Sequence, residues 1–172
     1  MNAEQATFLV EYFARMIESE VPTTARVIAA VPEDRKDYKP DEKSRSAWDL
    51  AKHLATSDVW FLDSIIKGSF VMDPNEPEPP GLNTIEDLVR FYNRELPDRI
   101  TKLRGLPAEK LTEKVDFFGV MQMPNASYVG FAQNHSVHHR GQLAAYIRAM
   151  GSKVPSIYGG SADEPFAAAA TT

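Results

Sequence analysis

Four long stretches with the apolar periodicity of amphipathic helices constrain the fold of this 172-residue chain more than any other feature. In each, apolar side chains recur every three or four positions and therefore share one helix face. The stretches are residues 4–30, 47–67 and 85–104, and a fourth that begins at residue 125 or 127 and ends at residue 150. Four of the twelve prolines lie in the loop between the second and third, which excludes regular structure there. No strand pattern competes with the helices, so the sequence predicts an all-α four-helix bundle.

The first helix shows the stripe most clearly. Its large apolar side chains follow helical spacing at Phe8, Leu9, Tyr12, Phe13, Met16 and Ile17. We expect this stripe to face the core. Residues 111–124 follow no helical period, and they are predicted to form either a short hairpin or an extended linker.

Capping residues mark the ends of the later helices. Ser46 followed by Asp49, and Thr84 followed by Asp87, have the spacing of a capping box, in which side chains bond otherwise free backbone amides. Gly151 follows the last helix and suits the left-handed conformation that ends many helices. The helix bounds given above follow from these signals.

The composition is that of one globular domain. With 172 residues, 43% of them hydrophobic, the chain can build one core but is short for two. We expect a single domain over residues 1–160 and a flexible tail over residues 161–172, where the sequence is low in complexity. The net charge of −5 and the lack of a Lys/Arg cluster argue against nucleic acid as a partner.

The cysteine count and the first residues bear on the compartment. The chain has no cysteine, which excludes disulfides and fits a reducing cytoplasm. Glu4 and Glu11 interrupt the first apolar pattern, which is typical of a mature helix and not of a signal peptide. No apolar run approaches the roughly 20 residues of a membrane span. We therefore expect a soluble, cytoplasmic protein without a membrane partner.

Three of the four histidines are candidates for one metal site. His135 and His139 lie about 40° apart around one helix, so they point from the same face. His53 lies in the second helix, and a bundle can bring it alongside. Spacing alone leaves two interpretations open, a metal site or hydrogen-bonded core histidines. Arg140 falls well away from this face, and we expect it to cap, pair or contact a second subunit.

Three further polar residues lie close to these histidines in the sequence. Asp49, one turn before His53, either orients that ring or only caps its helix, and capping is the simpler role. His138 is predicted to be partly exposed, either at the rim of a pocket or in contact with the metal ligands from outside. It also has the spacing to bind a metal ion together with His135. Gln142 either hydrogen-bonds a metal-bound water or bridges two helices.

Two segments resemble a known family. Residues 134–159, NHSVHHRGQLAAYIRAMGSKVPSIYG, closely resemble the C-terminal signature of the DinB superfamily. Residues 44–58, SRSAWDLAKHLATSD, resemble its second helix, in which a tryptophan precedes the first histidine by five positions. The resemblance covers nearly the whole chain. It implies a DinB-like up-down-down-up bundle with a long crossover, and a homodimer.

The resemblance also implies the ligands, because His53, His135 and His139 match the three metal-ligand positions of the family. A nitrogen-only set suits zinc, nickel, copper or iron(II), and we favour zinc or nickel. Three neutral rings leave the charge of the ion uncompensated, which favours a bound hydroxide or thiolate. The implied function is a metal-dependent enzyme acting on a small molecule, either a thiol S-transferase using a low-molecular-weight thiol or a hydrolase. Metal-bound water or thiolate would then be the reacting group.

Two alternatives belong to other classes of protein. A non-catalytic metal-binding or stress-response bundle would hold a structural ion, closed by a fourth protein ligand. An interaction module would use its exposed helix faces, Val137 included, to form a dimer. The sequence places no carboxylate as a general base. No catalytic residue therefore distinguishes the enzyme from these two alternatives.

Overall fold

The computed structural model describes residues 1–72 and 79–166, and this part of the chain is mostly helical. The long helices are α1 (Ala3–Ala29), α2 (Ala47–Lys67), α3 (Ile85–Arg104) and α5 (Ser127–Ala149). The short elements are the 3-10 helix η1 (Glu33–Arg35), α4 (Ala108–Thr112), β1 (Lys114–Phe117) and β2 (Met121–Pro124). The long helices begin and end within one residue of the predicted bounds.

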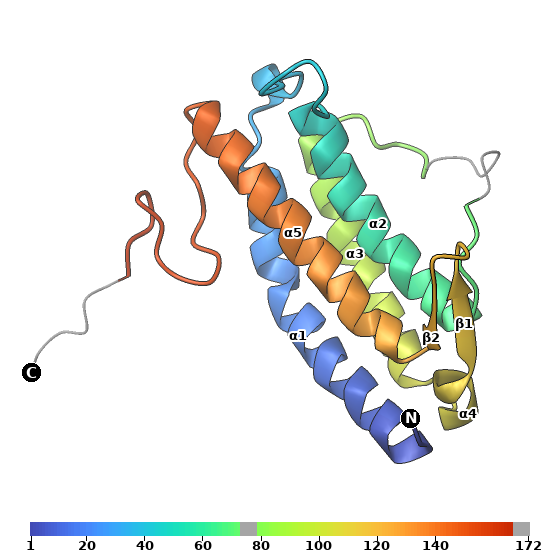
Figure 1. Ribbon diagram of the computed structural model, residues 1–172. Helices are drawn as coiled ribbons and strands as arrows, with labels where there is room; N and C mark the ends of the chain where they lie inside the picture. Colours follow the sequence, from blue (N-terminus) through green and yellow to red (C-terminus); the bar gives the residue numbers. More distant parts are fainter. Residues whose placement is uncertain (73–78, 167–172) are drawn as a thin grey trace, which may run out of the picture.

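The four long helices lie side by side (Figure 1). α1 and α2 each pack against both α3 and α5. In the view of Figure 1, α1 and α5 rise from the lower end of the molecule, whereas α2 and α3 descend from the upper end. The interior between them is filled by aliphatic and aromatic side chains from every long helix. This arrangement brings α2 and α5, which carry the histidines, into direct contact.

The predicted caps are present at the helix ends. Ser46 Oγ accepts a hydrogen bond from the backbone amide of Asp49 at 3.0 Å, and Thr84 forms a complete capping box with Asp87. Gly151 has a φ of 75°, the left-handed conformation expected after α5. Helices of this kind bury one face and expose another. Of the helices in the described part of the chain, none is long and apolar enough to cross a membrane.

The buried face of α1 differs from the predicted stripe. Phe8 is 69% exposed and Tyr12 is 52% exposed, whereas Ala6 and Ala14 are fully buried. The prediction was wrong for these aromatic residues and right for Ile17, which is 8% exposed. The physical reason is close packing, because small side chains let α1 approach the neighbouring helices. Helix periodicity does not tell which of two apolar faces packs against those helices.

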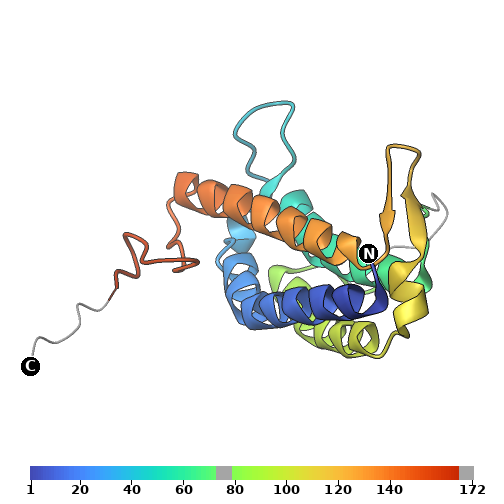
Figure 2. The same ribbon diagram turned by 60° about the horizontal axis from the view of Figure 1, so that its bottom comes forward.

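Residues 111–124 contain a hairpin, one of the two predicted alternatives. β1 and β2 pair antiparallel, with Val115 opposite Met123 and Phe117 opposite Met121. The hydroxyl of Tyr128 on α5 donates to the Val115 carbonyl at 2.8 Å and ties the hairpin to the bundle. Figure 2 shows the two strands projecting at the end of the molecule where α5 begins.

The chain after α5 runs back along the bundle. Glu164 pairs with Arg26 of α1 at 2.5 Å, and Asp163 pairs with Arg148 of α5 at 2.5 Å. Residues 167–172, half of the predicted tail, lie outside the described residues. The division into a domain over residues 1–160 and a flexible tail stays a prediction.

Candidate metal centre

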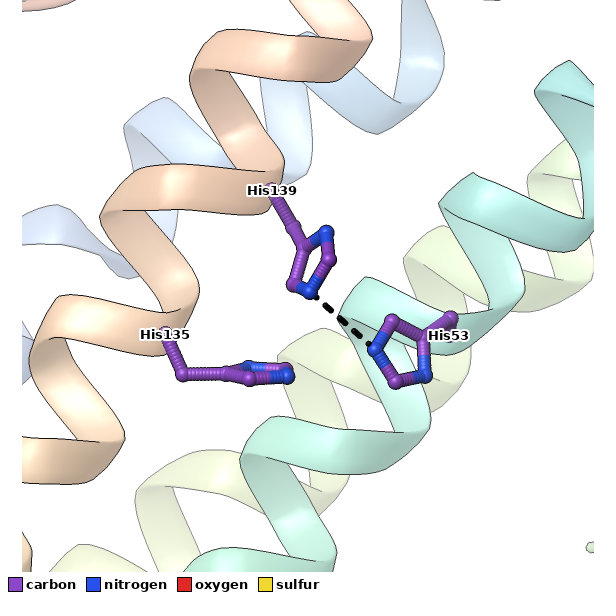
Figure 3. Close-up of side chains that lie close together, drawn as sticks. All are labelled: His53, His135 and His139. Atoms are coloured by element: carbon purple, nitrogen blue, oxygen red, sulfur yellow. Dashed lines mark hydrogen bonds between the residues drawn. The ribbon is translucent and has the colours of Figure 1, made fainter. Parts of the chain in front are cut away.

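His53 of α2 and His135 and His139 of α5 meet where these two helices pack (Figure 3). The Nε2 atoms of His53 and His139 lie 3.2 Å apart. One nitrogen of each ring lies within 4.8 Å of one nitrogen of both others. Two nitrogens that bind one tetrahedral zinc ion at their usual bond length are separated by about 3.3 Å. The observed separation therefore fits two rings that share one ion.

The rings of His53 and His139 are oriented through their second nitrogen atoms. His139 Nδ1 lies 3.1 Å from Gln142 Oε1, and His53 Nδ1 lies 3.0 Å from Ser57 Oγ. An amide oxygen only accepts, so His139 carries its proton on Nδ1 in this pair, which leaves the Nε2 lone pair facing His53. Gln142 thus contacts a histidine ring, rather than only bridging two helices.

Of the predicted outer residues, Asp49 does not reach the cluster, whereas His138 contacts His139 from the exposed side. Asp49 accepts a hydrogen bond from Ser46 Oγ at 2.7 Å, which gives it the capping role and leaves Ser57 as the neighbour of His53. His138 is exposed, and its ring centroid lies 4.8 Å from that of His139. The sequence places Ser57 one helical turn after His53 and so on the same face, but it did not indicate that Ser57 bonds the ring.

All three rings are neutral at neutral pH. Burial, assisted by the nearby charge of Arg45, lowers the pKa of His53 to about 4. Burial lowers the pKa of His135 to about 3 and also lowers the pKa of His139. Metal binding requires the unprotonated ring. In addition, His135 Nδ1 is buried and has no hydrogen-bond partner in the described part of the chain. This donor set fits a divalent cation.

The histidine cluster opens onto a cleft of about 670 Å³, whose lining includes His53 and His135. Aromatic side chains form a large part of its walls, namely Trp60, Phe61, Phe91, Phe117, Phe118 and Phe131. Phe61 stands next to the cluster, with its ring centroid 5.0 Å from that of His135. Small-molecule sites have volumes of roughly 300–1,000 Å³ and mostly apolar walls. The cluster is thus accessible to a small molecule.

A buried carboxylate, missed in the sequence, lies behind the cluster. Asp58 Oδ2 accepts hydrogen bonds from Tyr92 Oη at 2.9 Å and from Ser136 Oγ at 2.8 Å. Burial raises the pKa of Asp58 to about 7. Asp58 does not line the cleft, so it supports the helices behind the histidines and does not face a bound molecule. The sequence did contain a signal for this buried carboxylate, because Asp58 stands among apolar residues of α2.

Arg140 of α5 is also buried, at 1% exposure. Its guanidinium donates to Thr24 Oγ1 at 2.9 Å and pairs with Glu20, both on α1. Pairing was one of the predicted roles, but it takes place in the interior. The structure gives Arg140 no role beside the histidines; it joins α5 to α1.

Fold and site together define a class: a mostly helical protein with a group of three histidines, open to an aromatic cleft, that can hold a metal ion. The sequence comparison then identifies the family. The DinB family model matches residues 2–167, so the chain belongs to the DinB family.

Relatives and solved structures agree with this assignment. The chain is 28% identical over 130 residues to the uncharacterized protein YjoA of Bacillus subtilis strain 168, covering 74% of this chain and 82% of YjoA. It is 44% identical over 54 residues to the uncharacterized protein YrdA of the same organism, 31% of this chain and 32% of YrdA.

Two crystal structures have the same fold. That of the DinB-like protein YjoA superposes with a TM-score of 0.67 at 25% identity, covering 91% of this chain and 98% of YjoA. That of a DinB-like protein from Bacillus cereus ATCC 10987 has a TM-score of 0.69, covering 86% of this chain and 97% of the other. The sequence identity between this protein and our chain is 22%, so the comparison supports a shared fold and nothing further.

Proposed function

We propose that His53, His135 and His139 bind a divalent cation, zinc or nickel, and that the protein is a metal-dependent enzyme acting on a small molecule. The observation that carries this proposal is the 3.2 Å separation of the His53 and His139 Nε2 atoms at the end of an open cleft. Three histidines with an open side are typical of catalytic metal sites. A bound divalent cation would act as a Lewis acid toward a thiol, water or carbonyl group.

The surrounding residues have separate tasks in this proposal. Gln142 and Ser57 hold two of the rings in the orientation for binding. The aromatic walls keep water away from one side of the reacting group, which strengthens electrostatic interactions there. Arg45 lines the cleft and adds positive charge near the histidines.

Among reaction classes, thiol S-transfer is supported slightly better than hydrolysis. Asp63 is the carboxylate that lines the cleft among the described residues, and it is held by Arg99 at 3.1 Å. Hydrolysis usually engages a carboxylate or histidine as general base. A low-molecular-weight thiol loses its proton more easily than water and needs less help from a base.

The alternative is a non-catalytic metal-binding or stress-response bundle with a structural ion. That role favours a fourth protein ligand. The three histidines form the metal-binding group found among the described residues, and Asp49, a possible fourth ligand, is engaged in capping. The geometry therefore supports the enzyme better than the structural site.

Topology, assembly and location extend the proposal. The helix directions support an up-down-down-up four-helix bundle with a long crossover between α2 and α3 (Figure 1). A homodimer is supported by the exposed aromatic pair Phe8 and Tyr12 on α1, whose ring centroids lie 6.3 Å apart. A cytoplasmic location is supported by the absence of cysteine.

The decisive experiment measures metal content in protein purified without a metal-affinity tag, for the wild type and His53→Ala together. We expect near-stoichiometric zinc or nickel in the wild type and its loss in the variant. Wild-type protein that binds no metal, even after reconstitution, refutes the proposal. If bound metal persists in the variant, the ligand assignment of His53 is wrong.

A further inference from the structure

The cleft beside the histidines has both polar and aromatic lining. Its polar residues include His53, His135 and Arg45, and also Asp63 and Lys67 further along α2. A row of aromatic rings leads away from His135: Phe61 lies 5.0 Å from His135 and 5.6 Å from Phe131, and Phe131 lies 5.3 Å from Phe117, measured between ring centroids. A molecule that fills this space can therefore contact aromatic rings and charged groups at the same time.

The aromatic walls favour a flat apolar body. Phe118 at the tip of the hairpin lies nearly parallel to Trp60 of α2, with an angle of 6° and a centroid distance of 6.3 Å. Phe118 has a φ of 54°, a left-handed conformation that is costly for a side chain other than glycine. It is also 44% exposed, so burial in the core does not explain its orientation. The ring is held at the mouth of the cleft, where it can cover a bound molecule.

The charges on the cleft favour an anion. Arg45 and Lys67 line it, and neither side chain takes part in an ion pair within residues 1–72 and 79–166. Asp63, which also lines it, is paired with Arg99. Among the described lining residues the unpaired charge is therefore positive, and Arg45 lies near enough to His53 to help lower the pKa of that ring. Arginine is well suited to bind a carboxylate through two parallel hydrogen bonds.

We propose that the substrate is an amphipathic organic anion, with a flat apolar body between the hairpin and α2 and a single anionic group at Arg45 beside the histidines. This inference rests on the proposed function, because it takes the cleft to be the substrate site of the metal-dependent reaction. It adds a substrate class and a residue that selects it, Arg45.

The test uses two probes that differ in one group, 2-naphthoate and the uncharged 2-naphthylmethanol. Binding to full-length protein, metal-free and zinc-loaded, is measured by calorimetry and by tryptophan fluorescence, since Trp60 lines the cleft. We expect naphthoate to bind about fivefold more tightly, the effect of one partly exposed ion pair. Arg45→Gln should abolish this preference, and Arg15→Gln, an exposed arginine on α1 far from the cleft residues, should retain it.

The apolar part is tested at the hairpin tip. Phe118→Ala should weaken both probes about fivefold through lost aromatic contact. Val120→Ala, a change at an exposed apolar residue outside the cleft lining, should leave both unchanged. Equal affinity for the two probes, or a preference that survives Arg45→Gln, overturns the inference.

Zinc content of the same samples separates this inference from the proposed function. Zinc-binding protein without a preference for naphthoate overturns the substrate class alone. Protein that shows the Arg45-dependent preference but binds neither zinc nor nickel overturns the proposed function and leaves the anion site standing. Circular dichroism of each variant verifies that binding is lost from folded protein.

Discussion

The Nε2 atoms of His53 and His139 lie 3.2 Å apart although the residues are separated by 86 positions in the chain. Neutral imidazole nitrogens with lone pairs facing each other repel, unless a proton or a cation lies between them. Packing of α2 against α5 holds the two rings in this arrangement. The fold therefore brings together three histidines that can hold a cation.

His139→Ala should remove bound metal and leave the helices in place, because the rest of the core is untouched. The matched control is His138→Ala, an exposed neighbour that lies outside the three-histidine group. Elemental analysis and circular dichroism measure the two properties. Stoichiometric metal in the His139 variant contradicts the ligand assignment, and unfolding that follows metal loss indicates a structural site.

Gln142→Ala should weaken metal binding about tenfold without abolishing it, because it removes the acceptor that orients His139. Competition with a chelator of known affinity measures the change. Gln142→Glu, which keeps an acceptor oxygen at the same distance from the backbone, should restore most of the affinity. Equal affinity in the Ala variant and the wild type would show that the ring needs no such support.

Asp58→Asn should change the dependence of stability on pH. The pKa of Asp58 is raised from 3.8 to about 7 in the folded protein by burial, partly offset by Ser136, Tyr92 and Arg140. The native state therefore binds more protons than the unfolded state between these values, so this group's contribution to stability falls as pH rises from about 4 to about 7. Above that range its ionisation costs the native state a few kcal/mol.

The measurement is urea unfolding of metal-free wild type and Asp58→Asn at pH 4.5 and pH 8. The stability of the variant relative to the wild type should increase with pH. The lowered pKa values of His53 and His135 have the opposite effect at low pH, but they occur in both proteins and cancel in the comparison. A difference that is the same at both pH values would mean that Asp58 titrates normally.

Arg140→Ala should destabilise the bundle by about 3 kcal/mol, because it leaves Glu20 and Thr24 on α1 without their buried partner. Arg148→Ala is the control, since Arg148 is 50% exposed in its pair with Asp163 and should matter little. Urea unfolding of both variants gives the comparison. Similar stability in the two would show that the interior pair is no stronger than the surface pair.

Phe8→Ser combined with Tyr12→Ser should convert a dimer into a monomer, if the exposed aromatic pair of α1 forms the contact. Light scattering after size-exclusion chromatography measures the mass of each form. Val120→Ser, which removes an exposed apolar side chain from the hairpin, should leave the mass unchanged. A dimer that survives the double change places the contact on another surface.

Local sequence signals determined the helices and two of the three histidines of the site. Helix bounds depend on periodicity and on caps such as Thr84 with Asp87, which act within one turn. The pairing of His135 with His139 is equally local, because four residues make one helical turn. The membership of His53 in the same group came from the family resemblance, since spacing cannot relate two helices.

Only the tertiary structure decided which helix faces are covered and which polar groups are buried. Phe8 and Tyr12 have the periodicity of a core face, yet the face with Ala6 and Ala14 is the one that packs. Arg140 reaches the interior because Glu20 and Thr24 lie opposite on α1. Which face packs and which polar side chain is buried depend on the distance between helices and on partners that are remote in sequence. A local sequence pattern contains neither.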